Sequence, residues 1–216
     1  TSAYGGGTPT LTVDPTNGWI YASGNFMRAM GVRKDGIARV NAAGVIDLAW
    51  KPLGLSEVFS HVSDLNDNLY AHGLDAVTGT KVIVRWSPST GNLPTHVYRV
   101  GSAANDPNSG IDVLYSGTSR WIYFSGDGAL RRIDAITGEL DTVWNYPITQ
   151  SLLSISQGAL SDSPLFVAEE QYPGLERAWN IRRVDIGANA NVLWTNTYVP
   201  GFASIAADNR NGVYVL

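Results

Sequence analysis

The chain has 216 residues and a formal net charge of -4, and only 16% of its residues are charged. It contains no cysteine, which excludes disulfides, thiolate zinc sites and cysteine nucleophiles. A folded chain of this length buries about 70% of the surface that its unfolded form exposes, so a core forms without cross-links.

The charge pattern also limits the partners. Lys34, Lys51 and Lys81 are the only lysines, and no basic cluster follows a phosphate backbone, so we expect no nucleic acid partner. No apolar run reaches the length of a membrane helix, so we expect no membrane insertion. The weakly charged, polar composition favours an extracellular, cell-surface or virion location. The first residue is Thr1 rather than methionine, which points to a processed or partial product.

Short strands are predicted from the start of the chain. Runs of β-branched and aromatic residues are bounded by Gly, Pro, Asn or Asp, and no segment has helical periodicity. The first four strands are predicted at residues 11–14, 19–23, 37–41 and 45–50.

The same pattern then recurs along the chain. Aromatic residues in the second strand of each unit follow at intervals of 43 to 53 residues, at Tyr21, Tyr70, Tyr123, Phe166 and Tyr214. An arginine recurs in the third strand at Arg39, Arg85, Arg132 and Arg183. A turn follows each arginine strand, and a bulky apolar residue comes after it, at Trp50, Val97, Trp144 and Trp194.

These repeats predict the fold class. A single four-stranded sheet leaves an apolar face uncovered, so repeats of this length must stack, as in a β-propeller. We predict an all-β protein, a β-propeller of four-stranded antiparallel blades with four blades plus part of a fifth, in one domain. The units are expected at residues 8–53, 54–101, 110–148 and 150–198, with a partial unit at 199–216. Four residues near the start match four near the end at a constant offset of 194, namely Thr1, Tyr4, Gly7 and Asp14 with Thr195, Tyr198, Gly201 and Asp208. The sequence thus starts at the tail of one blade and stops within the second strand of another, so we expect a portion of a larger propeller.

Part of this pattern resembles known repeats. Residues 20–26, 31–32 and 37–41, with Asp47 and Trp50, resemble the delta-60 repeat, a bacterial and phage propeller-type repeat. Residues 132–139 with Trp144 are similar to the tryptophan-bearing repeat of quinoprotein-type propellers. Delta-60-like repeats occur in secreted, surface and phage tail-associated proteins. The resemblance therefore implies a recognition or scaffolding role and transfers no catalytic residues.

Two groups of residues have the chemistry of metal ligands. Residues 64–68, Asp-Leu-Asn-Asp-Asn, have the oxygen side chains of a calcium loop, but residues 14–18 and 208–212 occupy the same place in their units and have the composition of a hairpin turn. His61, His72 and His96 all lie in the second unit, and zinc would need all three plus a carboxylate. We favour turns and strand histidines, and predict no metal and no cofactor.

The recurring arginines allow two interpretations. A ring of four guanidinium groups around a central channel would attract an anion. Alternatively, each arginine contacts a carbonyl or carboxylate of a neighbouring blade, which we favour because repeats preserve structural positions.

No catalytic residues are predicted. The sequence lacks a GxSxG elbow, and Ser23-Gly24 and Ser125-Gly126 recur at equivalent strand ends. Glu169 and Glu170 have the chemistry of a glycosidase pair, but adjacent residues of a strand point to opposite sides.

Aromatic residues outside the repeat register are the best candidates for partner contact. These are Tyr115, Tyr172 and Trp179. An insertion at residues 171–178 lengthens a hairpin beside the last two, and residues 101–110 form a second long connection. Because loops carry function more often than their scaffold, both segments are expected at a contact surface.

The leading hypothesis is therefore a non-catalytic recognition or structural propeller module of a secreted, cell-surface or phage tail-associated virion protein. Its expected partners are a protein or a surface glycan, together with other subunits of a larger assembly. One alternative is a lectin-like propeller that binds carbohydrate. The other is an enzyme, such as a quinoprotein dehydrogenase or a glycan-cleaving propeller.

Overall fold

A computed structural model describes most of the chain. The described residues are 10–14, 17–24, 26, 28–34, 36–64, 68–87, 92–99, 114–116, 120–126, 128–148, 152–157, 163–171, 178–187, 190–198, 204–208 and 212–215. Every regular element among them is a β-strand. Over these residues, no helix is long and apolar enough to cross a membrane. The chain divides into two compact units, Thr1–Asp106 and Pro107–Leu216.

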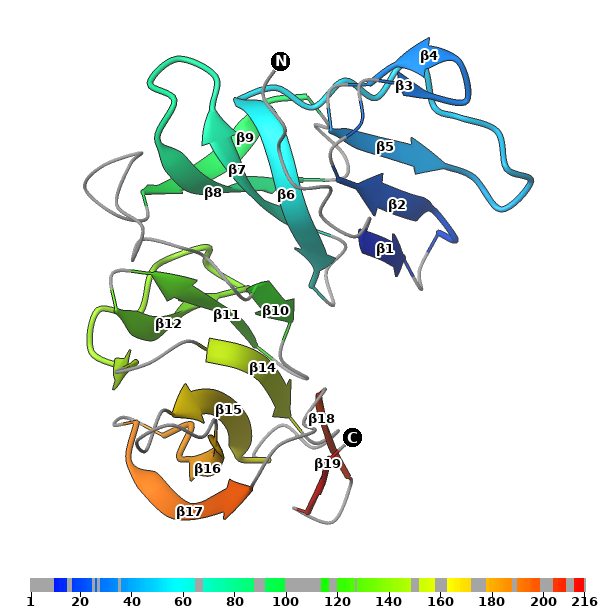
Figure 1. Cartoon of the computed structure of the whole chain (residues 1–216). Coiled ribbons are helices and arrows are strands. Elements are labelled where there is room, and N and C mark those ends of the chain that lie inside the picture. The colour runs from blue at the N-terminus through cyan, green and yellow to red at the C-terminus, as the bar shows by residue number, and fades with distance from the viewer. Residues whose placement is uncertain are drawn as a thin grey trace. The chain divides into compact units, whose positions relative to one another are not determined.

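The first unit contains two antiparallel sheets (Figure 1). The first consists of β1 (Thr10–Val13), β2 (Ile20–Ser23) and β5 (Ile37–Val40), with the small hairpin β3 (Arg28–Ala29) and β4 (Val32–Arg33) inserted between β2 and β5. The second consists of β6 (Leu55–Ser63), β7 (Leu69–Asp75), β8 (Lys81–Trp86) and β9 (Pro94–Arg99). In both sheets the strands pair in chain order.

The second unit follows the same plan. Its first sheet is β10 (Leu114–Ser116), β11 (Trp121–Gly126), β12 (Ala129–Asp134) and β13 (Tyr146–Pro147). The next is β14 (Leu152–Gln157), β15 (Leu165–Gln171), β16 (Ala178–Val184) and β17 (Val192–Tyr198). A two-stranded sheet of β18 (Ile205–Ala207) and β19 (Val213–Val215) comes last. The prediction of successive antiparallel sheets is confirmed, and three of them have the expected four strands.

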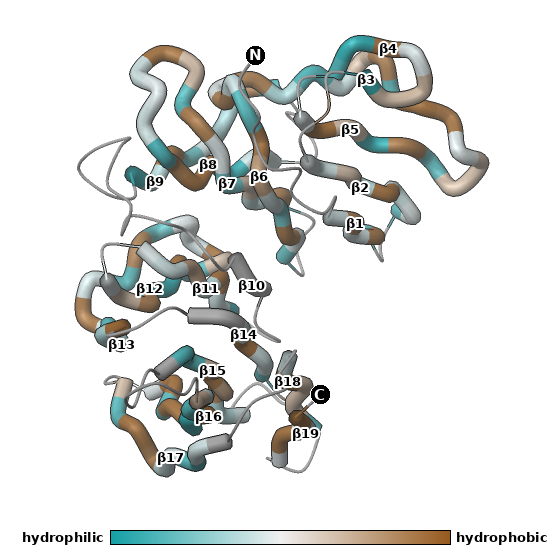
Figure 2. Tube along the Cα trace, in the orientation of Figure 1, coloured by the Kyte–Doolittle hydropathy of each residue, from teal (hydrophilic) through white to brown (hydrophobic). Residues whose placement is uncertain are grey.

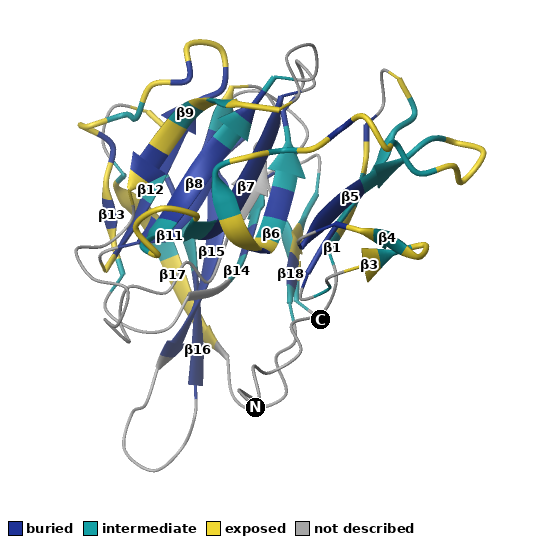
Figure 3. Cartoon of the chain, turned by 90° about the horizontal axis from the view of Figure 1, so that it is seen from above, coloured by how far each residue is buried: buried dark blue, intermediate teal, exposed yellow. Residues whose placement is uncertain are grey.

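Apolar side chains concentrate on the middle strands. Val82, Ile83 and Val84 of β8 are completely buried, which agrees with the brown stretch of this strand in Figure 2 and the dark blue stretch in Figure 3. The hairpin β3–β4, in contrast, is exposed or half-buried (Figure 3). A strand buried on both sides needs a sheet on each face, so these sheets are stable only when stacked.

Stacking is visible in the shared cores of each unit. In the first unit, Tyr21, Ile37 and Trp50 pack against Val58 and against β7 and β8. In the second unit, Tyr123, Leu130, Trp144 and Tyr146 pack against Ile155, Leu165, Val167 and Val184. Phe166, Ala168 and Ile181 in turn pack against Ile205 of the last sheet.

The expected fourth strand of the first sheet does not form. Within residues 45–50, only Ile46 makes a β-bridge, to Val40. Asp47 ends the pairing because its Oδ1 accepts hydrogen bonds from the backbone N–H of Ala49, at 2.8 Å, and of Trp50, at 3.1 Å. The resulting turn places the Trp50 indole in the core.

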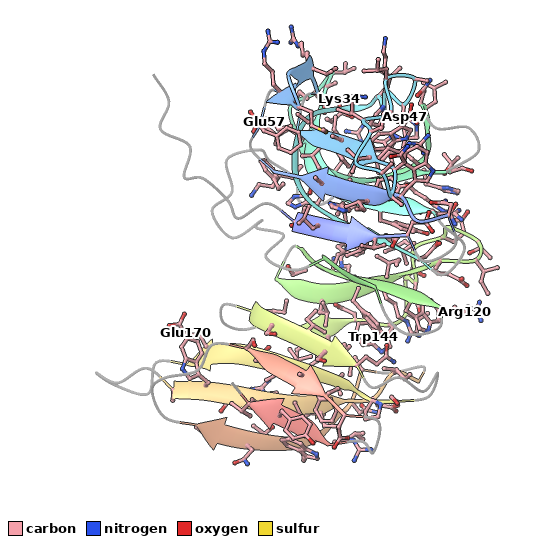
Figure 4. The ribbon with its side chains drawn as sticks, turned by 90° about the vertical axis from the view of Figure 1, so that its right-hand side faces the viewer. Lys34, Asp47, Glu57, Arg120, Trp144 and Glu170 are labelled. Atoms are coloured by element: carbon pink, nitrogen blue, oxygen red, sulfur yellow. The ribbon has the colours of Figure 1, made fainter. Side chains whose placement is uncertain are left out.

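The second unit repeats this turn. Oδ1 of Asp141 accepts hydrogen bonds from the backbone N–H of Val143 and Trp144, both at 3.0 Å. Asp47-Leu48-Ala49-Trp50 and Asp141-Thr142-Val143-Trp144 share the spacing of aspartate and tryptophan, and Trp144 (Figure 4) is completely buried. We name both segments the Asp-turn-Trp motif.

One glycine is required by a close approach of two strands. A Cβ added to Gly73 of β7 would lie 1.9 Å from the carbonyl oxygen of Glu57 on β6. The β6–β7 register shifts on both sides of Glu57, so the irregular strand presses against the glycine. No side chain larger than hydrogen fits there without moving the backbone.

Candidate functional site

The three aromatic candidates do not form a described cluster. Tyr115 lies in β10 opposite Tyr123, and its side chain is outside the described part of the structure. The described residues also exclude 172–177 of the insertion, which contain Tyr172, and the connection at 101–110. Trp179 is in β16, opposite Glu170 and Tyr198, and only 9% of it is exposed. The role of these aromatics in partner contact stays a prediction.

A buried polar cluster in the second unit joins two sheets. Nη1 of Arg182, on β16, lies 3.1 Å from Oε2 of Glu169 on β15 and donates a hydrogen bond of 2.9 Å to the hydroxyl of Tyr146 on β13. Glu169 is fully buried. Burial raises the pKa of Glu169, although Arg182 and Tyr146 oppose the rise, and burial likewise raises the pKa of Tyr146.

A carboxyl group with a raised pKa has the property of a general acid. In this cluster, however, the Glu169 carboxyl group already interacts with the guanidinium of Arg182 and the phenol of Tyr146. Glu170, labelled in Figure 4, follows Glu169 in the same strand and therefore points to the other face of the sheet. The two glutamates do not face each other across a shared site, as glycoside hydrolysis would require.

The histidines have separate environments. Nδ1 of His61 lies 2.7 Å from Oγ of Ser23, so this pair bridges β6 and β2. His72 packs against the ring of Phe59, with ring centroids 5.1 Å apart, and His96 stacks on Tyr98.

The strands of His61 and His72 are neighbours, as expected, but His61 is opposite Ala71, so the pleat turns His72 to the other face. Burial lowers the pKa of His61 to about 4 and that of His72 to about 3. Among the described residues, no three His, Asp or Glu side chains form a group that could hold a metal ion.

In two of the aspartate-containing turns, carboxylate oxygens accept hydrogen bonds from residues of the same turn. Oδ1 of Asp64 accepts a hydrogen bond from the backbone N–H of Asn68, and Oδ2 accepts one from the Asn68 side chain. Oδ1 of Asp208 accepts the N–H of Gly212 at 2.7 Å in the equivalent turn. These bonds stabilise a tight reversal, which is the structural role that favours Asp at such positions.

Two of the four recurring arginines are held by the Asp-turn-Trp motif. Nε of Arg39 donates to Asp47 at 2.9 Å, and Nε of Arg132 donates to Asp141 at 2.9 Å. Each guanidinium also lies over the motif's tryptophan ring, 5.1 Å from its centroid in both cases. The cation–π contact and the ion pair therefore fix the same guanidinium group.

The contacts of Arg132 extend to the next sheet of its unit. Its Nη1 and Nη2 donate to the backbone carbonyls of Ile186 and Gly187, in the turn that follows β16. This is the contact with a neighbouring carbonyl that we favoured over an anion-binding ring. Arg39 does not make the expected contact through its carboxylate partner, because Asp47 lies in the turn that follows the arginine's own strand, β5.

Sequence reasoning missed a buried lysine. Nζ of Lys34 donates to the backbone carbonyls of Asp47, at 2.8 Å, and Trp50, at 2.5 Å. Lys34 (Figure 4) therefore links the first and last residues of the first Asp-turn-Trp motif. Burial lowers the pKa of Lys34, and the Asp47 carboxylate opposes this effect. The only available signal was the scarcity of lysine, which occurs three times.

Comparison with known proteins gives no family. No protein-family model matches the chain, and no curated protein matches its sequence.

Solved structures provide the likeness. The structure titled "Structure of Dos1 propeller" aligns with 97% of the chain at a TM-score of 0.61 and 11% identity, and the chain spans 52% of its length. The extracellular domain of the putative one component system BT4673 from B. thetaiotaomicron aligns with 91% of the chain at a TM-score of 0.53 and 11% identity, and the chain spans 25% of it. Successive antiparallel sheets and this likeness agree that the chain has a β-propeller fold.

Proposed function

We propose that the chain is a non-catalytic recognition or structural module of a secreted, cell-surface or phage tail-associated protein, built from repeats of the delta-60 type. The observation that carries the proposal is the internal use of reactive side chains in the described residues. Glu169, Asp141 and His61 have the chemistry of acids and bases, and each is engaged by a neighbouring strand or turn.

The exposed surface also supports recognition. Apolar side chains are exposed in the turns that follow β5, β7 and β12, namely Val45, Leu48, Val77, Ile136 and Val143. Apolar exposure on turns, combined with few charges, is compatible with contact to a protein or a glycan. One similar solved structure is itself an extracellular domain, which favours a location outside the cell.

The test compares binding with turnover. The purified chain is screened on an array of glycans and on immobilised bacterial surface proteins, and in parallel against soluble glycan substrates for release of reducing sugar. We expect binding without turnover. Turnover that Glu169→Gln abolishes and Glu170→Gln leaves intact would replace the proposal with a glycan-cleaving enzyme, and absorbance of a bound quinone would replace it with a dehydrogenase.

The array result separates the two binding classes. Saturable binding to a defined glycan would identify the lectin-like alternative. Binding to a surface protein without glycan dependence would identify the protein-contacting module that we favour, because its exposed turns are aliphatic and aromatic rings stack better on sugars.

A further inference from the structure

The four larger sheets differ in the strand that ends each of them. In the order of pairing, these last strands are β5, β9, β13 and β17. The outer edge of a last strand carries main-chain N–H and C=O groups that can pair with a strand of another chain, and propellers usually keep such edges short and protected. Three of the four strands have a feature that limits this pairing.

The three protected strands use different features. On β5, Val40 already forms a bridge to Ile46. β9 begins with Pro94, which has no N–H, and ends with the exposed Arg99. β13 has only two residues, and one of them is a proline. Proline, surface charge and short length each make an edge a poor template for a further strand.

β17 has none of these features. Its seven residues, Val192–Tyr198, include no proline and no charged residue. β17, orange in Figure 1, pairs with β16 on one side, and no strand of the described residues pairs with it on the other. The register with β16 shifts near the start of β17 and is regular from Trp194 to Tyr198. We name the unpaired side of residues 194–198 the free edge.

The side chains of β17 suit an extended partner. Five of those that the structure describes are exposed, namely Val192, Leu193, Thr195, Asn196 and Thr197. Valine and threonine are typical of strands, because their branched side chains pack against a neighbouring strand. None of the five is charged, so a charged segment would lose hydration here without gaining an opposite charge. The free edge therefore favours an uncharged segment with β-branched residues.

Packing of neighbouring sheets does not cover this edge. Blades of a propeller stack face to face, and the contact of Phe166 and Ile181 with Ile205 is such a contact on the face of the sheet. The N–H and C=O groups of a strand, in contrast, point along the plane of its own sheet. The free edge is therefore a property of the β14–β17 sheet itself.

We propose that the free edge of β17 binds an extended, uncharged segment of a partner protein as an added strand. Main-chain hydrogen bonds supply the affinity, and the exposed side chains of β17 supply the preference for β-branched residues. A protein fits better than a glycan, because only another main chain matches a row of alternating N–H and C=O groups. The inference names the partner of the proposed recognition role and rests on that role.

A peptide probe tests the added strand directly. The parent peptide is capped and fluorescent, has the seven-residue length of β17 and alternates threonine with valine. Two further peptides carry N-methyl groups on the odd or on the even residues. An added strand uses only one of its own edges, so one N-methylated peptide should bind like the parent and the other at least about tenfold more weakly. No binding of the parent at millimolar concentration, or equal binding of all three, overturns the proposal.

Proline substitutions locate the contact on β17. Of Thr195→Pro and Asn196→Pro, one removes an N–H that is bonded to β16 and the other removes an N–H that points outward. The variant that keeps the wild-type circular dichroism should bind the parent peptide at least about tenfold more weakly. Leu48→Asp, which removes an exposed apolar side chain of the first unit, should bind it like wild type. Wild-type affinity in the folded proline variant overturns the proposal.

Hydrogen exchange of the wild-type chain gives a readout without any substitution. The parent peptide should slow the exchange of outward-pointing amides of residues 194–198, and unchanged exchange there overturns the proposal. Sedimentation equilibrium tests the other occupant: a dimer that forms with wild type but not with the folded proline variant assigns the free edge to a second copy of the chain and overturns the proposal.

Binding of whole proteins separates this inference from the recognition role. A bacterial surface protein that binds the wild-type chain and the folded proline variant equally overturns the added strand and leaves the recognition role intact. A surface protein that binds only the wild-type chain supports both. Turnover of a glycan without binding of any protein or peptide overturns both.

Discussion

The bridge between His61 and Ser23 predicts a measurable dependence of stability on pH. His61 is buried and its pKa is about 4, whereas an unfolded histidine has its ordinary pKa of 6.5. The unfolded chain therefore binds a proton between these values that the folded chain does not. The contribution of neutral His61 to stability is fully present above pH 6.5 and is lost as the pH falls toward 4.

The size of the effect follows from the two pKa values. At pH 5 the unfolded histidine is almost fully protonated and the folded one is almost neutral, so His61 destabilises the fold by about 2 kcal/mol relative to pH 7. His72, whose pKa is about 3, contributes a similar amount. For a chain of this size, each loss corresponds to roughly 4–8 °C in melting temperature.

The variant Ser23→Ala/His61→Leu isolates one of these contributions. It reproduces the apolar pairing of Ala168 with Ile205, so neither residue leaves a buried polar group without a partner. We expect a fold close to wild type at pH 7 and about half of the wild-type loss between pH 7 and pH 5. Glu169 titrates equally in both proteins, so the difference between them reports His61 alone.

The assay is urea unfolding at pH 5, 6 and 7, with His72→Phe as a second single-histidine control. The reasoning is refuted if the double variant loses as much stability as wild type on acidification. A His61 ring that titrates near pH 6.5 in the folded protein, as followed by NMR, would refute it independently.

Three further predictions concern packing and ion pairs. Asp141→Ala removes two turn hydrogen bonds and the counter-ion of a buried arginine, and should lower the free energy of unfolding by about 3 kcal/mol in urea unfolding. Asp75→Ala removes a similar but exposed turn cap and should lower the free energy of unfolding much less. Gly73→Ala should destabilise by about 3 kcal/mol, because its Cβ would overlap a carbonyl, and wild-type stability would show that β6 yields easily. Arg182→Met should destabilise more than Glu169→Leu/Arg182→Met in thermal unfolding, because the single variant leaves a buried carboxylate unpaired; equal losses would argue that the pair is not coupled.

Repeats in the sequence predict the sheets well because strand alternation and stacking impose the period. The pairing of Tyr21 with Arg39 and of Tyr123 with Arg132 shows that the two recurring positions lie side by side in the sheet. The absence of a fourth strand after Arg39 was not predictable from apolar content, since Val45 to Trp50 contains enough of it. It depends on a single carboxylate that caps the turn.

The polar cluster was beyond sequence reasoning for a different reason. Glu169 follows the recurring aromatic residue of its second strand, Phe166, by three residues. The equivalent position is a glycine in the other sheets, at Gly24, Gly73 and Gly126. Alternation correctly separates Glu169 from Glu170, but no local pattern indicates that Tyr146 and Arg182 meet Glu169 across two sheets.

The Asp-turn-Trp motif also determines how the outer edges of two sheets meet the surroundings. On the side of β5 that faces away from β2, Val40 pairs with Ile46 and the carbonyl of Arg39 accepts the N–H of Asp47, after which the chain turns and places Trp50 in the core. The same bend follows β12, where Leu140 and Asp141 pair with Ile133 and Arg132. A strand from another chain could pair with this edge only by displacing the short partner and exposing a buried tryptophan. The motif therefore disfavours aggregation through edge-to-edge strand pairing.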